Sequence, residues 1–222
     1  MAAYHSESAD PNRPVAGMKL PEALTTLIGG DAYISLNMYN AENGPSYSEE
    51  FIGRYRSAQR ARNQRITDWV VTEIDRLKIE GVFERVFTMQ RVWADLRLMG
   101  PAIDRSDREI GICYAGDARR ANFDARGIGN MSSLRSWLSM WSLEYSCCSG
   151  SRHLQRIELP ALVIQSTADA GVFPSDAEKI FDDLASDDKE LKLVAGDHYL
   201  LEPEGIRGIV ADLIGNWVRA RI

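Results

Sequence analysis

Short apolar runs alternate with helical periodicity in the last third of the chain. Ala161 to Gln165 is an apolar run preceded by Pro160 and followed by polar residues, and Leu191 to Val194 is a second short stretch with strand character. Runs of this length with these flanks predict two buried parallel strands. Ser175 is predicted to cap a helix between them, and the apolar stripe from Ile206 to Val218 predicts a closing helix. The pattern is that of an α/β domain.

A long amphipathic helix is predicted to end near Gly81. Apolar residues recur at helical spacing from Phe51 to Leu77, and Ser46 and Glu49 have the spacing of a capping box. Five arginines occupy other positions of the same helix. In an acidic chain this arrangement favours a solvated helix face over an anion site. The arginines are Arg54, Arg56, Arg60, Arg62 and Arg65.

The remaining segments have weaker patterns. Residues 1–46 are rich in Gly, Pro, Asn and Ser and predict an irregular segment, with one short apolar helical stretch near Leu20 to Ile28. Val82 to Leu98 fits either a helix or a strand, and Pro101 to Asn130 predicts a loop. We therefore expect an irregular segment at 1–46, a helical cap region at 47–150 and the C-terminal α/β part at 151–222.

A second helix is predicted late in the cap region, with Ser132 or Ser133 as its cap. Its apolar stripe favours core or inter-domain packing over contact with a ligand. The stripe consists of Leu134, Trp137, Leu138 and Trp141.

Composition excludes several classes of protein. The chain has 222 residues, of which 45% are hydrophobic and 26% charged, as in ordinary globular proteins. A net charge of -6 argues against nucleic acid or an anionic membrane as a partner. The N-terminus has no apolar signal region, and no run approaches the roughly 18 apolar residues of a membrane span. We expect a cytoplasmic protein.

Neither a metal nor a cofactor is expected. Cys113, Cys147 and Cys148 lack the C-x-x-C spacing of a redox or metal site, which favours small buried or idle thiols. The glycines between positions 111 and 129 lack the G-x-G-x-x-G spacing and the strand-turn-helix frame of a dinucleotide site.

Two residues that can carry chemistry follow the two predicted strands. Asp169 comes shortly after the strand that ends at Gln165, and His198 comes shortly after the strand that ends at Val194. Loops at the carboxyl ends of parallel strands open on the same edge of the sheet, so the two side chains can approach hydrogen-bond distance. A carboxylate that orients an imidazole is the arrangement that activates a nucleophile. A turn-capping aspartate and an ordinary loop histidine remain the alternative.

The segments around these two residues resemble the α/β-hydrolase family. Leu159 to Asp169, LPALVIQSTAD, is similar to the penultimate strand and acid loop of that family, and Lys189 to Tyr199, KELKLVAGDHY, to its last strand and histidine loop. The region from Tyr47 to Cys148 is similar to a helical cap and its connection. The resemblance implies a partial α/β-hydrolase fold, in which Asp169 and His198 are the acid and base of a catalytic triad.

The sequence departs from the family at the nucleophile. No serine or cysteine lies in a G-x-S-x-G elbow, and the loop that builds part of the oxyanion hole is also missing. Three explanations remain open: a truncated gene product, a subunit whose nucleophile comes from a second polypeptide, and a remnant that retains only packing or binding.

Two functions follow from these explanations. The first is an esterase-like hydrolase of ester, amide or related bonds in small-molecule substrates, with an inactive isolated chain. The second is a non-catalytic interaction module that uses the Trp137 and Trp141 stripe and an exposed sheet edge. Cys113, Ser132 and Ser6 are the residues to mutate first if the isolated chain proves active.

Overall fold

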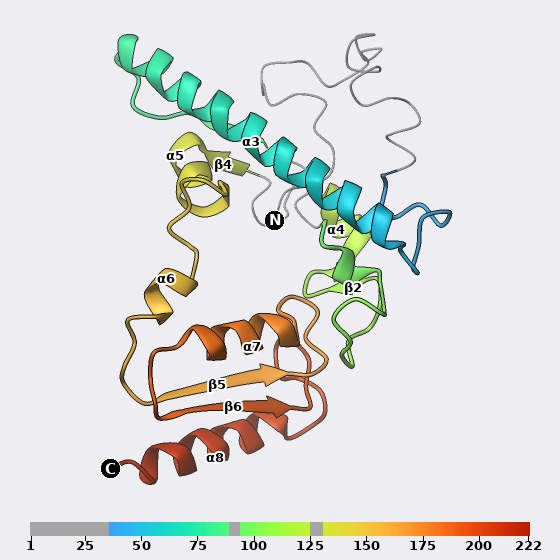
Figure 1. Ribbon diagram of the computed structural model, residues 1–222, viewed down its shortest axis with the longest axis vertical. Helices are drawn as coiled ribbons and strands as arrows, with labels where there is room; N and C mark the ends of the chain where they lie inside the picture. The colour runs from blue at the N-terminus through green and yellow to red at the C-terminus, as the bar shows by residue number, and fades with distance from the viewer. Residues whose placement is uncertain (1–35, 89–93, 125–130) are drawn as a thin grey trace. The chain divides into compact units, whose positions relative to one another are not determined.

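The computed structural model describes residues 36–88, 94–124 and 131–222, which form a mixed α/β structure (Figure 1). The chain divides into two compact units. The first contains the described residues up to Gly100 together with Asp117–Cys148, and the second contains Pro101–Gly116 and Ser149–Ile222. Residues 101–116 therefore belong with the C-terminal part of the chain, although the sequence places them in the cap region. The predicted helical stretch near Leu20 to Ile28 lies outside the described residues.

Helix α3 (Glu49–Ile79) is the predicted long amphipathic helix of the first unit. Its N-cap is Ser48, whose backbone is extended and whose hydroxyl accepts a hydrogen bond from the backbone N–H of Phe51 at 3.1 Å. The prediction that Ser46 and Glu49 form a capping box is wrong. Spacing does not decide which of two nearby serines adopts the extended backbone that a cap requires.

The cap can be tested with its neighbour as a matched control. Ser48→Ala removes the acceptor for the Phe51 N–H, so we expect it to lower the free energy of unfolding of the first unit by about 1 kcal/mol. Ser46→Ala should change it by less than about 0.5 kcal/mol, as is usual at exposed positions without such a role. Urea unfolding followed by far-UV circular dichroism measures both values. Equal losses in the two variants would contradict the cap.

The core of the first unit forms where α3 meets the predicted second helix. That helix begins as α5 (Leu134–Ser136), capped by Ser133, and continues as a π-helix, η2 (Trp137–Trp141). The indole N–H of Trp137 donates to the Thr67 hydroxyl at 3.3 Å, and its ring meets Phe87 edge to face. The predicted core role of the stripe is confirmed. Only 3% of Trp137 is exposed, so this residue offers little surface to a partner. The buried cluster consists of Ile66, Val70, Leu77, Phe87, Leu134 and Trp137.

Short elements occupy the segments with weak sequence patterns. Strand β1 (Val86–Thr88) pairs antiparallel with β4 (Met131–Ser133), and η1 (Leu96–Leu98) is a 3₁₀ turn. The predicted loop from Pro101 contains β2 (Ile112–Cys113), β3 (Gly116–Asp117) and α4 (Ala118–Phe123). The prediction of a loop over the whole of Pro101 to Asn130 is therefore wrong. Elements of two to six residues are too short to show a repeating pattern of apolar residues in the sequence. Helix α4 begins instead at a side-chain cap, Asp117.

The second unit contains a two-stranded parallel sheet and its helices. Strand β5 (Ala161–Ser166) pairs with β6 (Lys189–Val194), in a register from Ala161↔Lys189 to Ser166↔Val194. Helix α6 (Ser151–Leu154) precedes β5, α7 (Pro174–Asp183) connects the strands, and α8 (Ile206–Arg219) follows β6. Figure 1 shows α7 alongside β5 and α8 alongside β6. The predicted parallel strands and closing helix are confirmed.

Two details of this unit differ from the predictions. Helix α7 begins with Pro174 after Phe173, whose N–H donates to the Asp176 carboxylate at 3.0 Å, so Ser175 is not the cap. Strand β5 is buried only at its carboxyl end, and Ala161 to Ile164 are half-buried. A strand in a larger parallel sheet is covered on both faces and paired on both edges. Within the described residues, β5 has a paired strand on one edge only.

No helix in the described ranges combines the length and the apolar character that crossing a lipid bilayer requires.

Candidate active site

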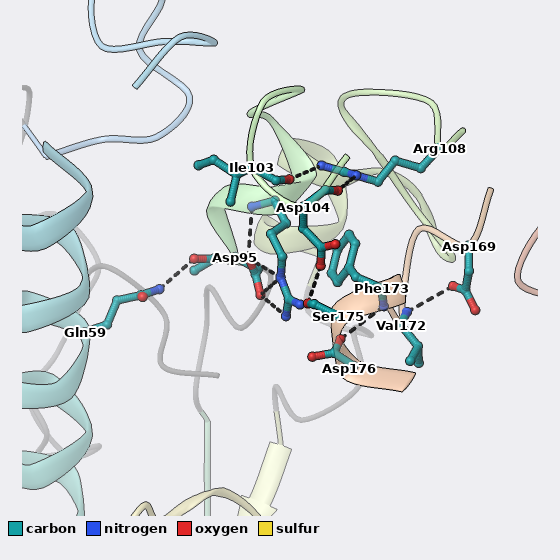
Figure 2. Close-up of polar contacts among 12 residues, drawn as sticks. Gln59, Asp95, Ile103, Asp104, Arg108, Asp169, Val172, Phe173, Ser175 and Asp176 are labelled. Carbon is teal, nitrogen blue, oxygen red and sulfur yellow. Dashed lines mark hydrogen bonds and ion pairs between the residues drawn. The ribbon is translucent and has the colours of Figure 1, made fainter. Parts of the chain in front are cut away.

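Asp169 is held in a tight loop at the carboxyl end of β5. The backbone N–H groups of Thr167 and Ala168 donate to the carbonyls of Val194 and Gly196, which ties the start of the loop to the segment after β6. Oδ1 of Asp169 then accepts hydrogen bonds from the N–H of Gly171 at 2.7 Å and from the N–H of Val172 at 3.0 Å, the latter shown in Figure 2. The residue is only 7% exposed. The carboxylate is thus held in place by its own loop.

His198 reaches this carboxylate from the loop after β6. Its Nδ1 lies 2.9 Å from Oδ1 of Asp169, as the sequence predicts for side chains on neighbouring strand ends. An ionised carboxylate can only accept, so Nδ1 carries the hydrogen of this bond. In the neutral ring, Nε2 is then the basic nitrogen. The His198 side chain remains 30% exposed, which leaves the ring accessible from solvent.

Two tyrosine rings contact the imidazole of His198. The ring of Tyr114 stacks on His198 with centroids 4.8 Å apart and planes 20° apart, and the ring of Tyr199 meets it edge to face at 4.9 Å. The Tyr199 hydroxyl also donates to the Tyr114 carbonyl at 3.3 Å. Burial raises the pKa of Tyr114 above its usual value, so its phenol is neutral near pH 7. The rings restrict the orientations available to the imidazole.

The segment that carries Tyr114 is anchored to the acid loop. The N–H of Asp107 donates to the Thr167 carbonyl at 2.9 Å. Arg108 is buried and donates to the carbonyls of Ile103, at 2.7 Å, and Asp104, and its guanidinium lies 5.2 Å from the centre of the Phe173 ring (Figure 2). These contacts explain why residues 101–116 belong to the second unit.

Sequence reasoning does not identify Tyr114 as a site residue. It lies 85 residues before Tyr199, and no motif connects it to His198. Sequence reasoning also misses Gln165, which is buried. Its side-chain amide donates to the Val172 carbonyl at 3.0 Å and so connects strand β5 to the acid loop. An amide at the end of an otherwise apolar strand is the one sequence signal that points to it.

Gly171 allows the close approach of the imidazole to the acid loop. A Cβ atom at this position would lie 2.6 Å from Cδ1 of Tyr114 and 3.1 Å from Nδ1 of His198. We therefore expect Gly171→Ala to displace both rings and to break the bond between His198 and Asp169. The resonance of the hydrogen-bonded Nδ1 proton, observed by NMR, should be lost from this variant.

A second glycine provides the control for this experiment. Gly208 lies in α8 with nothing within 4 Å of its Cβ position, so Gly208→Ala should preserve the Nδ1 proton resonance. It should also raise stability by about 0.5 to 1 kcal/mol. An unchanged resonance in Gly171→Ala would show that the loop adapts to a methyl group.

The structure describes two of the three other candidate residues. Cys113 is buried in β2, Ser132 is buried in β4 of the first unit, and Ser6 lies outside the described residues. Cys113 is buried, whereas Cys147 and Cys148 are exposed, so of the expected small buried or idle thiols only Cys113 is of the buried kind. Within the described ranges, no three His, Cys, Asp or Glu side chains are grouped so that they could hold a metal ion.

No protein-family model matches this chain, and neither does any curated protein or solved structure. The interpretation of the site therefore depends on the motifs and on the geometry of the two loops.

Proposed function

We propose that this chain carries the general base and the orienting acid of an α/β-hydrolase that acts on an ester, amide or related bond. The observation that carries the proposal is the 2.9 Å contact between Nδ1 of His198 and the buried, loop-held carboxylate of Asp169. The parallel pair of β5 and β6, with acid and base on successive loops in that chain order, also supports it.

In this reaction His198 moves a proton twice. Its Nε2 accepts the proton of the attacking hydroxyl or thiol, and the resulting imidazolium donates that proton to the leaving oxygen or nitrogen. Asp169 keeps the ring in the required tautomer and stabilises the imidazolium through the Nδ1 bond. The rings of Tyr114 and Tyr199 add steric restraint to the same orientation.

The nucleophile is proposed to come from a polypeptide segment outside this sequence, because no residue here lies in a G-x-S-x-G elbow. Among the residues that the structure describes, no strand pairs with the edge of β5 opposite β6, and this open edge supports the proposal. Since Ala161 and Thr167 donate toward the β6 side, the backbone groups of Leu162 and Ile164 point to the opposite edge. A further strand, leading to a nucleophile elbow, can pair there.

Reconstitution tests the proposal. The purified chain should hydrolyse p-nitrophenyl acyl esters no faster than a control protein, because acid and base alone provide no covalent route. Co-expression with the polypeptide encoded directly upstream should produce measurable turnover. If that region encodes two or more strands and a G-x-S-x-G elbow and the pair remains inactive, the proposal fails. Activity of the isolated chain that is lost on mutating Cys113, Ser132 or Ser6 would place the nucleophile within it.

The open edge also favours a second candidate function, a non-catalytic module that binds a partner strand along β5. This candidate predicts that a partner binds equally well to the wild type and to the His198→Ala variant. The hydrolase proposal instead predicts turnover that depends on His198. One co-expression experiment with both readouts separates the two functions.

A further inference from the structure

Two adjacent thiols lie on the surface of the first unit. Cys147 and Cys148 are both exposed, whereas Cys113 is 2% exposed. Exposure makes a thiol accessible to disulfide oxidants in solution, and adjacency ensures that the second thiol is near whenever the first has reacted.

The segment that carries these thiols is held firmly on the first unit. Asn63 of α3 donates to the Trp141 carbonyl at 2.8 Å and accepts from the Leu143 N–H at 2.9 Å. The hydroxyls of Thr67 and Ser142 are 3.1 Å apart, and both are buried. The turn after the π-helix is thereby fixed to helix α3.

The same turn fixes the backbone of the cysteines. The N–H of Cys147 donates to the Ser139 carbonyl at 3.1 Å, and the N–H of Cys148 donates to the Ser146 hydroxyl at 3.0 Å. That hydroxyl is in turn 3.2 Å from the carbonyls of Ser139 and Met140. The thiol of Cys147 also donates to the Tyr145 carbonyl at 4.0 Å, and that of Cys148 to the Ser139 carbonyl at 3.5 Å, so both exposed thiols lie on an ordered turn.

We propose that Cys147 and Cys148 form a reversible dithiol–disulfide site that reacts with low-molecular-weight disulfides such as oxidised glutathione. One thiolate attacks the oxidant's disulfide, which gives a mixed disulfide and releases one thiol. The neighbouring thiolate then attacks the protein sulfur of that mixed disulfide and expels the second thiol. Two protein thiols lose two hydrogens and two electrons in total, and one oxidant disulfide is reduced to two thiols.

Covalent geometry makes this disulfide a labile one. Adjacent Cα atoms are about 3.8 Å apart across a trans peptide. Unstrained disulfides join Cα atoms at least about 4.4 Å apart, and departures from that range make the bond easier to reduce. Strained and exposed disulfides are the regulatory ones, while structural disulfides resist the glutathione pool. The site is therefore suited to respond to the redox state of its surroundings.

Its position gives the oxidation a local structural effect. Closing the eight-membered ring changes the peptide between Cys147 and Cys148, so the hydrogen bond from the Cys148 N–H in that peptide to the Ser146 hydroxyl must change. Cys148 is the last residue of the first unit, and the chain enters the second unit at Ser149. Oxidation thus acts beside one of the three points at which the chain passes from one unit to the other.

Mass spectrometry of the full chain tests the site. After treatment with excess oxidised glutathione and digestion with trypsin, the peptide from Ser136 to Arg152, which contains both cysteines, should have lost two hydrogens and carry no glutathione. Excess reduced glutathione should restore its mass. Cys147→Ser and Cys148→Ser should each retain one glutathione on this peptide. Cys113→Ser should behave as the wild type, because Cys113 lies in the separate peptide from Glu109 to Arg119.

Three outcomes would overturn the proposal. They are two glutathione adducts on the 136–152 peptide, a disulfide between two chains through these cysteines, and an unmodified peptide after prolonged oxidation. None of these readouts depends on hydrolase activity, so the redox site and the proposed function can fail separately.

Discussion

His198→Ala is expected to lower kcat of the reconstituted hydrolase by about 10⁴-fold or more, because it removes the group that takes the proton from the nucleophile. Asp169→Asn should lower kcat by about 10³- to 10⁴-fold, since an amide can present a donor to Nδ1 and favour the wrong tautomer. The two changes should not be additive, because both disable one proton-transfer unit. Initial rates with p-nitrophenyl esters at saturating substrate measure these effects.

Two residues of the same types serve as controls for this series. Asp187 and His153 are exposed, and neither lies in the acid loop or the histidine loop. Asp187→Asn and His153→Ala should therefore change kcat by less than about twofold, as expected for surface substitutions away from the site. Turnover that survives His198→Ala at the level of these controls would refute the assignment of the base.

Trp137→Ala is expected to destabilise the first unit by about 3 to 5 kcal/mol. The indole is 3% exposed, packs in one cluster with Ile66, Val70 and Leu134, and donates its N–H to the buried Thr67 hydroxyl. Truncation leaves a cavity against α3 and removes that hydrogen bond. Urea unfolding followed by far-UV circular dichroism suits this measurement, because α3 contributes a large helical signal and tryptophan fluorescence would change with the mutation.

A neighbour on the same π-helix is the control. Met140 is 52% exposed, so Met140→Ala should alter the free energy of unfolding by less than about 0.5 kcal/mol. A loss below 1 kcal/mol in Trp137→Ala would mean that the two tryptophans of the stripe form a surface after all. That result would revive the interaction module that uses this stripe.

Long periodic elements were predictable from the sequence because their own side chains encode them. Helices α3 and α8 and the parallel pair of β5 and β6 follow from apolar spacing and from the Pro and Gly residues that flank it. The pairing of Asp169 with His198 was predictable for the same reason. Two consecutive parallel strands place their following loops on one edge, so chain order alone brings the acid and the base together.

Short elements and long-range contacts required the tertiary structure. Ser48 rather than Ser46 caps α3, and Phe173 rather than Ser175 precedes α7, because caps depend on the backbone angles of single residues. Periodicity contains no information about those angles.

The surroundings of His198 were equally hidden in the sequence. Tyr114 reaches the imidazole because Asp107 bonds to Thr167 of the acid loop and Arg108 contacts the Phe173 ring that follows this loop. Gly171 is required there because the Tyr114 and His198 rings lie against it. Such contacts join residues far apart in the chain and have no local signature. Hydrophobic periodicity thus determines which strands and helices form, while packing between distant segments determines what encloses the candidate base.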